Sequence, residues 1–324
     1  NLDYAEAVRL LAERANINIP QKNSYVDEAT LKKEKRTYEM NSIAARFFFD
    51  CLKSKENPEP LQYLINRKIE KDTIVSFGIG YAPNDWTKLT EFLKKKGFSE
   101  AEIIEAGLGS KSKNGTIDKF RNRIMFPIID IRNRVIGFGG RALDDKDVKY
   151  MNSPETCVYK KSKSLFSMNF AKNSREDYVI IVEGYMDCIS LHQAGFTNTI
   201  ASLGTALTDN QAKLIKRIFG QAVIAYDNDS AGQNASLRGL DMLANMGCVV
   251  KVLVLPKEDK HGRSIKDPDD YIKYKGKDEF KQAIKKSLML VEYKAQLLRS
   301  SCDLNTSEGQ IAFLKGVASA IGQV

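Results

Sequence analysis

The chain has 324 residues, of which 43% are hydrophobic and 28% charged, and its formal net charge is +9. This is the composition of a soluble globular protein, and no apolar run approaches the length of a membrane span. Five scattered cysteines without a CxxC pair exclude a disulfide framework and a zinc site, and they suit a reducing cytoplasm. Because there are only two histidines, a bound metal ion would be held by oxygen ligands.

The first third of the chain predicts mostly helices. Residues 1–15 predict a helix, residues 16–36 a polar loop, and residues 37–53 a second helix with Ile43 and Phe47 on its apolar side. The first residue is not Met and the end at Val324 is abrupt, so we expect a fragment of a longer protein.

Shorter elements follow. The segment "NPEPLQYLINRKI" predicts a helix with a proline start, and "FGIGYAP" predicts a strand and a turn. Two short helices come next, with Gly97 and Gly107 at the positions where helices commonly end.

The positive charge is concentrated in one stretch. Residues 111–175 contain 15 Lys or Arg and 6 Asp or Glu, which accounts for the whole excess. Within it, "RIMFPIID" and "RVIGFGG" are short β-rich runs separated by "IRNR", so a hairpin is predicted. The pattern indicates an α+β domain whose basic surface faces a polyanion.

The pattern of hydrophobic residues changes from about residue 176. Four continuous apolar runs predict a parallel sheet buried on both faces: "YVIIVE", "NTIAS", "AVIAYD" and "CVVKVLVLP". Helices are predicted between them at about 185–194, 208–219 and 230–246, and capping boxes begin at Thr208 and Ser230. We expect residues 256–276 to be a charged connection and 277–324 to be helical.

Acidic residues end two of the predicted strands. Glu183 closes "IIVEG", and Asp227 and Asp229 close "IAYDND", where parallel strands place ligands. Residues i and i+2 of an extended segment point the same way, so the two aspartates can share an ion. Such carboxylates repel one another unless a cation lies between them, and Mg²⁺ prefers oxygen ligands. Asp267 and Asp269 of "KDPDDYI" supply further acids.

Other interpretations of these acids compete with a metal site. Asp and Asn are ordinary turn formers, and the carboxylate of Asp187 could serve only to interact favourably with the dipole of its helix. An EF-hand loop beginning at Asp227 fails because its twelfth residue is Arg238 rather than Glu. The chain also has no G-x-x-x-x-G-K-[ST] motif, which excludes a P-loop enzyme.

Seven ordered motifs carry a family resemblance. "VEGYMD", "ASLGTALT", "YDNDSAG" and "KDPDDYI" resemble the metal-binding TOPRIM fold. Upstream, "RNRIMFPI", "IGFGGR" and "KYMNSPET" resemble the RNA-polymerase domain of bacterial DnaG-type primases. The resemblance implies a TOPRIM-type α/β parallel sheet flanked by helices, preceded by a basic α+β subdomain and followed by a helical one. The corresponding parts are 1–36 (N-terminal helix and linker), 37–175, 176–270 and 271–324.

The resemblance also implies roles for particular residues. Divalent metal, Mg²⁺ or Mn²⁺, would be held by the acidic set: Glu183, Asp227, Asp229, Asp267 and Asp269. Nucleotide phosphates or template would be met by a basic set: Arg121, Arg123, Arg141, Lys149 and Lys161. Where the family tends to read "HKG" this chain reads "YKKSK", so Lys160 and Lys163 are rivals of Lys161.

The activity implied is synthesis of short RNA primers on single-stranded DNA from nucleoside triphosphates. The implied protein is a cytoplasmic monomer that reaches the replicative helicase through a missing C-terminal domain, and this fragment holds no zinc. Two alternatives remain open at this point. One is a TOPRIM nuclease or topoisomerase, against which the GGR and NSPET motifs argue. The other is a non-catalytic DNA-binding module, which would have no reason to keep three repelling carboxylates.

Overall fold

The computed structural model describes residues 11–12, 14–15, 28–113, 115–144, 147–204, 206–227 and 230–322, without the side chains of 230–236. Most of the predicted helix at 1–15 therefore lies outside the described residues. The chain divides into two compact units, residues 1–36 and 37–324. Among the described residues, no helix is long and apolar enough to cross a membrane.

Helix α2 covers Glu28–Lys53. The prediction of a loop up to residue 36 is wrong from Glu28 onward, because "EATLKKEK" is built mostly of strong helix formers. The buried face of α2 contains Met40, Ala44, Phe48 and Leu52 at a spacing of four residues. Ile43 and Phe47, predicted on the apolar side, are only half-buried and lie beside this row.

The next elements include the predicted helix, strand and two short helices, together with a further helix and a two-stranded sheet that were not predicted. They are α3 (Glu59–Asn66), α4 (Lys71–Phe77), β1 (Gly80–Ala82), α5 (Lys88–Lys95), α6 (Glu100–Glu105), β2 (Gly109–Ser112) and β3 (Gly115–Asp118). Gly97 and Gly107 follow α5 and α6 with φ of 86° and 71°. A left-handed residue is a common way to end a helix, so the predicted helix ends are confirmed.

The basic region forms an antiparallel sheet with the order β1-β4-β5-β6. Strands β4 (Arg123–Ile129) and β5 (Val135–Ala142) pair as the predicted hairpin, and β6 (Tyr150–Asn152) adds to β5. A Cβ on Gly139 would lie 2.7 Å from Cε2 of Tyr185 and closer still to other atoms of that ring. The glycine therefore lets Tyr185, the first residue of helix α8 (Tyr185–Gln193), pack directly on β5.

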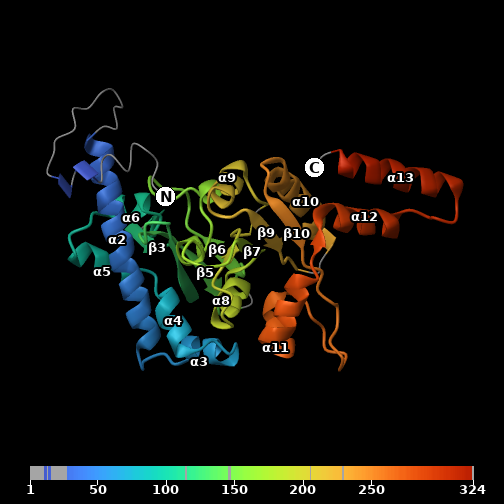
Figure 1. Cartoon of the computed structure of the whole chain (residues 1–324). Coiled ribbons are helices and arrows are strands. Elements are labelled where there is room, and N and C mark those ends of the chain that lie inside the picture. Colours follow the sequence, from blue (N-terminus) through green and yellow to red (C-terminus); the bar gives the residue numbers. More distant parts are fainter. Residues whose placement is uncertain are drawn as a thin grey trace. The chain divides into compact units, whose positions relative to one another are not determined.

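The second sheet has the order β11-β10-β9-β7-β8. Strands β7 (Tyr178–Val182), β8 (Thr199–Ala201), β9 (Gln221–Ile224) and β10 (Val249–Val252) are parallel, which confirms the prediction, and β11 (Leu288–Met289) is antiparallel. Helices α8 (Tyr185–Gln193), α9 (Asp209–Ile218) and α10 (Ser230–Asn245) alternate with the strands (Figure 1). Thr208 forms the predicted capping box of α9; the box predicted at Ser230 lies outside the described side chains.

Alternate residues of β7 face different helices. Ile180 and Val182 join one hydrophobic cluster with residues of α8 and α11 (Pro268–Lys285), whereas Val179 and Ile181 join another with residues of α9 and α10. Both faces of the sheet are therefore covered, as its continuous apolar strands predicted. Because α11 begins at Pro268, the predicted connection over 256–276 is wrong from that residue on.

The chain ends in helices α12 (Leu290–Ser301) and α13 (Ser307–Ile321), which pack against each other (Figure 1). A short 3₁₀ helix, η1 (Lys161–Lys163), and α7 (Met168–Ala171) join the two sheets. The prediction that residues 277–324 are helical from their amphipathic pattern is wrong around Leu288–Met289, which pair with β10 as strand β11.

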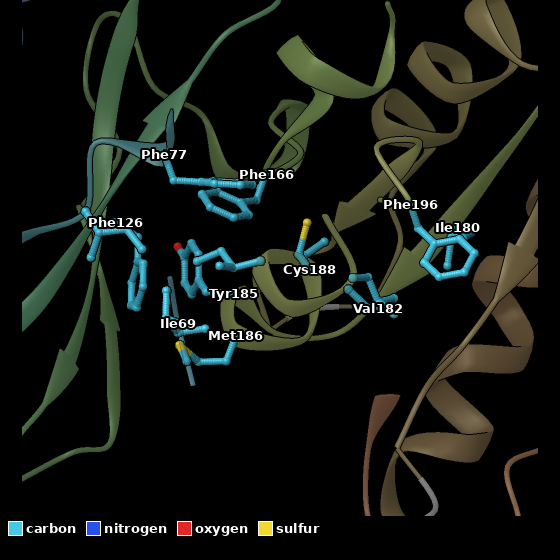
Figure 2. Packing of buried hydrophobic residues seen from close by; sticks show 14 of the residues in the cluster. Ile69, Phe77, Phe126, Phe166, Ile180, Val182, Tyr185, Met186, Cys188 and Phe196 are labelled. Atoms are coloured by element: carbon cyan, nitrogen blue, oxygen red, sulfur yellow. The ribbon is translucent and has the colours of Figure 1, made fainter. Parts of the chain in front are cut away.

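Tyr185 links the two sheets through their shared core. Its ring stacks on Phe126 of β4 at 5.1 Å and meets Phe166 edge-on at 4.8 Å, as Figure 2 shows. Both contacts are aromatic geometries that favour a fixed orientation. The antiparallel sheet is thus held against the start of α8, next to the edge where the acidic residues lie.

Candidate active site

Two neighbouring strands of the parallel sheet carry acids beyond their carboxyl ends. Glu183 follows β7 directly, and Asp227 lies three residues past the end of β9. The Ala225 N–H donates to the Ile181 carbonyl at 2.9 Å, which continues the parallel pairing beyond β9. Both acidic residues line one cleft with a volume of about 760 Å³. Asp229 lies outside the described residues.

Asp187, in the first turn of α8, lines the same cleft and is buried. A Cβ on Gly184 would lie 2.6 Å from its Oδ2, so the glycine makes room for this carboxyl group. Burial raises the pKa of Asp187 well above its usual range, and nearby carboxylates raise it further: those of Asp267, Asp227 and Asp269. Asp187 therefore belongs to the acidic cluster in space, beyond any effect on the helix dipole.

Asp267 and Asp269 lie at the start of α11 and also line the cleft. Asp267 is the N-cap residue, and its Oδ1 accepts a hydrogen bond from the Asp270 N–H at 2.7 Å. Burial is the main cause that raises the pKa of Asp267. Asp269 is 2% exposed, and its two oxygens accept hydrogen bonds from Ser190 Oγ and from Lys273 Nζ.

Basic residues of the antiparallel sheet line the same cleft. Arg141 of β5 is 8% exposed, and its Nη1 donates to the Tyr150 hydroxyl at 2.6 Å. Its guanidinium lies 5.2 Å from the Tyr63 ring and 5.3 Å from the Tyr150 ring, within reach of cation–π attraction. Burial raises the pKa of Tyr150 to about 12, so its hydroxyl stays neutral. Lys149 is exposed, and its carbonyl accepts a hydrogen bond from the Ala142 N–H at 2.9 Å.

The other predicted basic residues have different surroundings and are not among the residues that line the cleft. Arg121 lies over the Trp86 ring at 4.3 Å. Arg123 is buried, and its Nη1 donates to the Val148 carbonyl at 2.7 Å. Lys161 lies in η1, where its carbonyl accepts a hydrogen bond from Gln211 Nε2 at 3.1 Å.

Two site features were not predicted. Arg67, the C-cap residue of α3, lines the cleft, and its Nη1 lies 3.9 Å from Asp269 Oδ2. No local pattern distinguishes Arg67 from other surface arginines, because its role depends on α3 packing near α11. The second feature is a chain of hydrogen bonds: the Tyr185 hydroxyl donates to Asn152 Oδ1 at 2.7 Å, and Asn152 Nδ2 donates to the Leu203 carbonyl at 3.1 Å.

The carboxylates suit a hard divalent cation because they offer oxygen atoms as ligands and carry negative charge. Oxygen ligands are those that Mg²⁺ and Mn²⁺ prefer, and a cation would relieve the repulsion among these carboxylates, which adds to burial in raising the pKa of Asp187. Among the described residues, which exclude Asp229, no three such groups form a ready-made metal site. The cleft therefore offers carboxylates that can approach a cation, beside Arg and Lys side chains that can hold phosphates.

Comparisons with known proteins agree with this arrangement. A family described as DNA primase catalytic core, N-terminal domain, matches residues 47–172, and a Toprim-like family matches residues 180–272. The DNA primase of Clostridium acetobutylicum is 43% identical over 325 residues, covering 100% of this chain and 53% of that protein. The DNA primase of Deinococcus radiodurans is 38% identical, covering 96% and 52%. The chain thus spans about half the length of the curated relatives it matches.

Solved structures share the fold. A DnaG primase catalytic domain bound to ssDNA has a TM-score of 0.78 at 31% identity, covering 91% of this chain and 94% of that one. The RNA polymerase domain of Mycobacterium tuberculosis primase DnaG has a TM-score of 0.79 at 30% identity, covering 90% and 94%. These likenesses confirm the predicted fold class, including the TOPRIM-type sheet.

Proposed function

The chain belongs to the family of DnaG-type primase catalytic cores, and from that premise we propose that it synthesises short RNA primers on single-stranded DNA. The observation that carries the proposal is the single cleft in which carboxylates of the TOPRIM-type sheet meet Arg and Lys from the basic sheet. The reaction is attack by a 3′ hydroxyl on the α-phosphate of a nucleoside triphosphate, with pyrophosphate leaving. Both reactant and product carry phosphates that need cationic partners.

The acidic residues have a role in this proposal because the family implies use of a divalent metal ion. Glu183 and Asp227 would hold Mg²⁺ or Mn²⁺, together with Asp229, Asp267 and the buried Asp187. When bound, the ion would lower the cost of negative charge that develops on the phosphates.

The basic residues have a complementary role. Arg141 is pre-oriented by the Tyr150 hydroxyl and by the two aromatic rings beside it, so it would bind a triphosphate without first ordering its side chain. Lys149 and Arg67 would add charge-assisted contacts from the same cleft. Tyr185 and Asn152 would keep the two sheets at a fixed separation.

The template would lie along the basic sheet. A relative in the family is a DnaG primase catalytic domain bound to ssDNA, which supports single-stranded DNA as the template. Arg121 and Lys161 lie outside the cleft lining, so they are proposed to meet template phosphates, with Lys160 and Lys163 as rivals of Lys161. Arg123 would act by holding the Val148 carbonyl just before Lys149. Contacts to the DNA backbone predict strong salt dependence and weak sequence preference.

The remaining predictions also stay proposals. They are a monomer in the cytoplasm, contact with a replicative helicase through segments beyond this chain, and the four-part division at residues 36, 175 and 270. The gap between the two family matches, from 172 to 180, supports the second boundary.

The test is incorporation of labelled ribonucleotides on single-stranded DNA, with Mg²⁺ or Mn²⁺ and with EDTA. We compare the wild type with Asp227→Ala and with Asp278→Ala, an exposed acid of α11 that does not line the cleft. The proposal expects metal-dependent RNA from the wild type and from Asp278→Ala, and none from Asp227→Ala.

Other outcomes favour the alternatives. Metal-dependent cutting of the DNA without RNA product would replace the polymerase with a TOPRIM nuclease. Binding of DNA with neither product, under both metals and at high protein concentration, would favour a non-catalytic module.

A further inference from the structure

Asp269 differs from the other acids of the cleft in its partners. Its side chain is 3% exposed, and three groups from three elements surround its carboxylate. Ser190 Oγ of α8 donates to Oδ1, and Lys273 Nζ, one turn along α11, donates to Oδ2 at 2.5 Å. Arg67 Nη1 lies 3.9 Å from the same Oδ2. A buried anion with this environment is already neutralised.

A metal ion would compete with these partners. Mg²⁺ binds carboxylate oxygen at about 2 Å, close to where the Lys273 ammonium contacts Oδ2. The side chain of Lys273 is 15% exposed, so it cannot move into water without losing its buried ion pair. Coordination through Oδ1 would displace the Ser190 hydroxyl in the same way. By contrast, one Asp267 oxygen caps α11, and Lys273 acts on this carboxylate as a nearby charge, with no direct ion pair among the described residues.

The contacts of Asp269 lead to groups that do face the substrate. Arg67 lines the cleft, and its ion pair with Asp269 ties the end of α3 to the start of α11. The Asp269 N–H also donates to Asp187 Oδ1 at 3.3 Å, which orients a second cleft residue.

We infer that Asp269 is a positioning residue and not a ligand of the metal ion: its carboxylate holds Arg67 in place, and its backbone N–H, which a substitution retains, orients Asp187. The inference replaces the metal role that the sequence predicted for Asp269, and it rests on the proposed function. Loss of the Asp269 charge weakens the binding of triphosphate through Arg67 and leaves the number of bound metal ions unchanged.

The test compares Asp269→Asn with Asp227→Asn and the wild type in two measurements. Mn²⁺ binding is followed by the electron paramagnetic resonance signal of free Mn²⁺, which needs no catalysis. The KM for nucleoside triphosphate and kcat are measured in primer synthesis. Asp269→Asn keeps the wild-type Mn²⁺ stoichiometry and raises KM about tenfold with a smaller change in kcat, the pattern of lost binding contacts. Asp227→Asn loses bound Mn²⁺.

Two further variants separate positioning from loss of folding. Asp269→Asn with Lys273→Met removes both charges of the buried pair, so the fold is kept, while the KM stays raised. In a double-mutant cycle, adding Asp269→Asn to Arg67→Ala causes no further rise in KM, because each change removes the same contact between Arg67 and the triphosphate.

The inference is overturned if Asp269→Asn loses as much bound Mn²⁺ as Asp227→Asn does. It is equally overturned if the two KM effects in the cycle with Arg67→Ala add in full. Unchanged Mn²⁺ binding in Asp227→Asn would instead refute the metal site of the proposed function, and the cycle with Arg67→Ala would still decide the role of Asp269.

Discussion

Gly139→Ala should destabilise the protein by disturbing the contact between the two sheets. The new Cβ would lie 2.7 Å from Tyr185 Cε2 and closer still to the ring end, where the hydroxyl bonds Asn152. Overpacking a well-packed core costs about 1–3 kcal/mol. Loss of the Tyr185–Asn152 hydrogen bond adds about 1 kcal/mol, so we expect about 2–4 kcal/mol in all.

The assay is urea unfolding at pH 7, with the slope checked for two-state behaviour. Gly220→Ala is the matched control, because a Cβ there meets no described atom within 4 Å. It should change the free energy of unfolding by less than about 0.5 kcal/mol or raise it slightly. Gly139→Ala combined with Tyr185→Leu should cost less than the two single changes together, since the clash is relieved. A free energy of unfolding for Gly139→Ala as close to wild type as the control's would show that Gly139 does not make room for the Tyr185 ring.

Three further predictions concern single residues. Thr208→Ala should lower the free energy of unfolding by about 1 kcal/mol in urea, since Thr208 caps α9; no change would contradict the capping. Burial lowers the pKa of His192 to about 4, whereas the pKa of histidine in the unfolded chain is about 6.5. Between these two pH values the unfolded chain binds the proton and the folded protein does not, so the free energy of unfolding falls as the pH drops from about 6.5 to about 4. In His192→Gln that fall should be smaller than in wild type, and equal slopes would contradict it. Asp187→Asn should stabilise the metal-free protein in EDTA by about 1 kcal/mol yet weaken Mn²⁺ binding in titrations; a less stable variant would contradict the repulsion.

The parts of the fold that local patterns determine were predictable. Continuous apolar strands such as "YVIIV" can be buried on both faces only in a covered parallel sheet, and such a sheet brings the ends of β7 and β9 to one edge. The convergence of Glu183 and Asp227 on one cleft follows from that topology. Gly97 and Gly107 marked helix ends because their left-handed backbone is a local requirement.

The parts that depend on tertiary packing were not predictable. Arg123 and Arg67 look alike in sequence, yet one is buried against the Val148 carbonyl and the other lines the cleft. Asp267 and Asp269 are two residues apart, but one caps a helix and the other is bonded to Ser190 and Lys273. The polar segment from Glu28 is helical despite its loop-like composition, because helix formers outweigh its polarity.

We propose that the acids of the cleft act in chemistry and not in holding DNA. The most direct measurement is the rate of the first dinucleotide formed on single-stranded DNA by Asp227→Ala, alongside its affinity for the same DNA. We predict a rate at least about 100-fold below wild type, with DNA affinity within about twofold. A near-normal rate would show that Asp227 is not needed for the chemistry. A loss of rate matched by an equal loss of DNA binding would show that it acts in holding DNA.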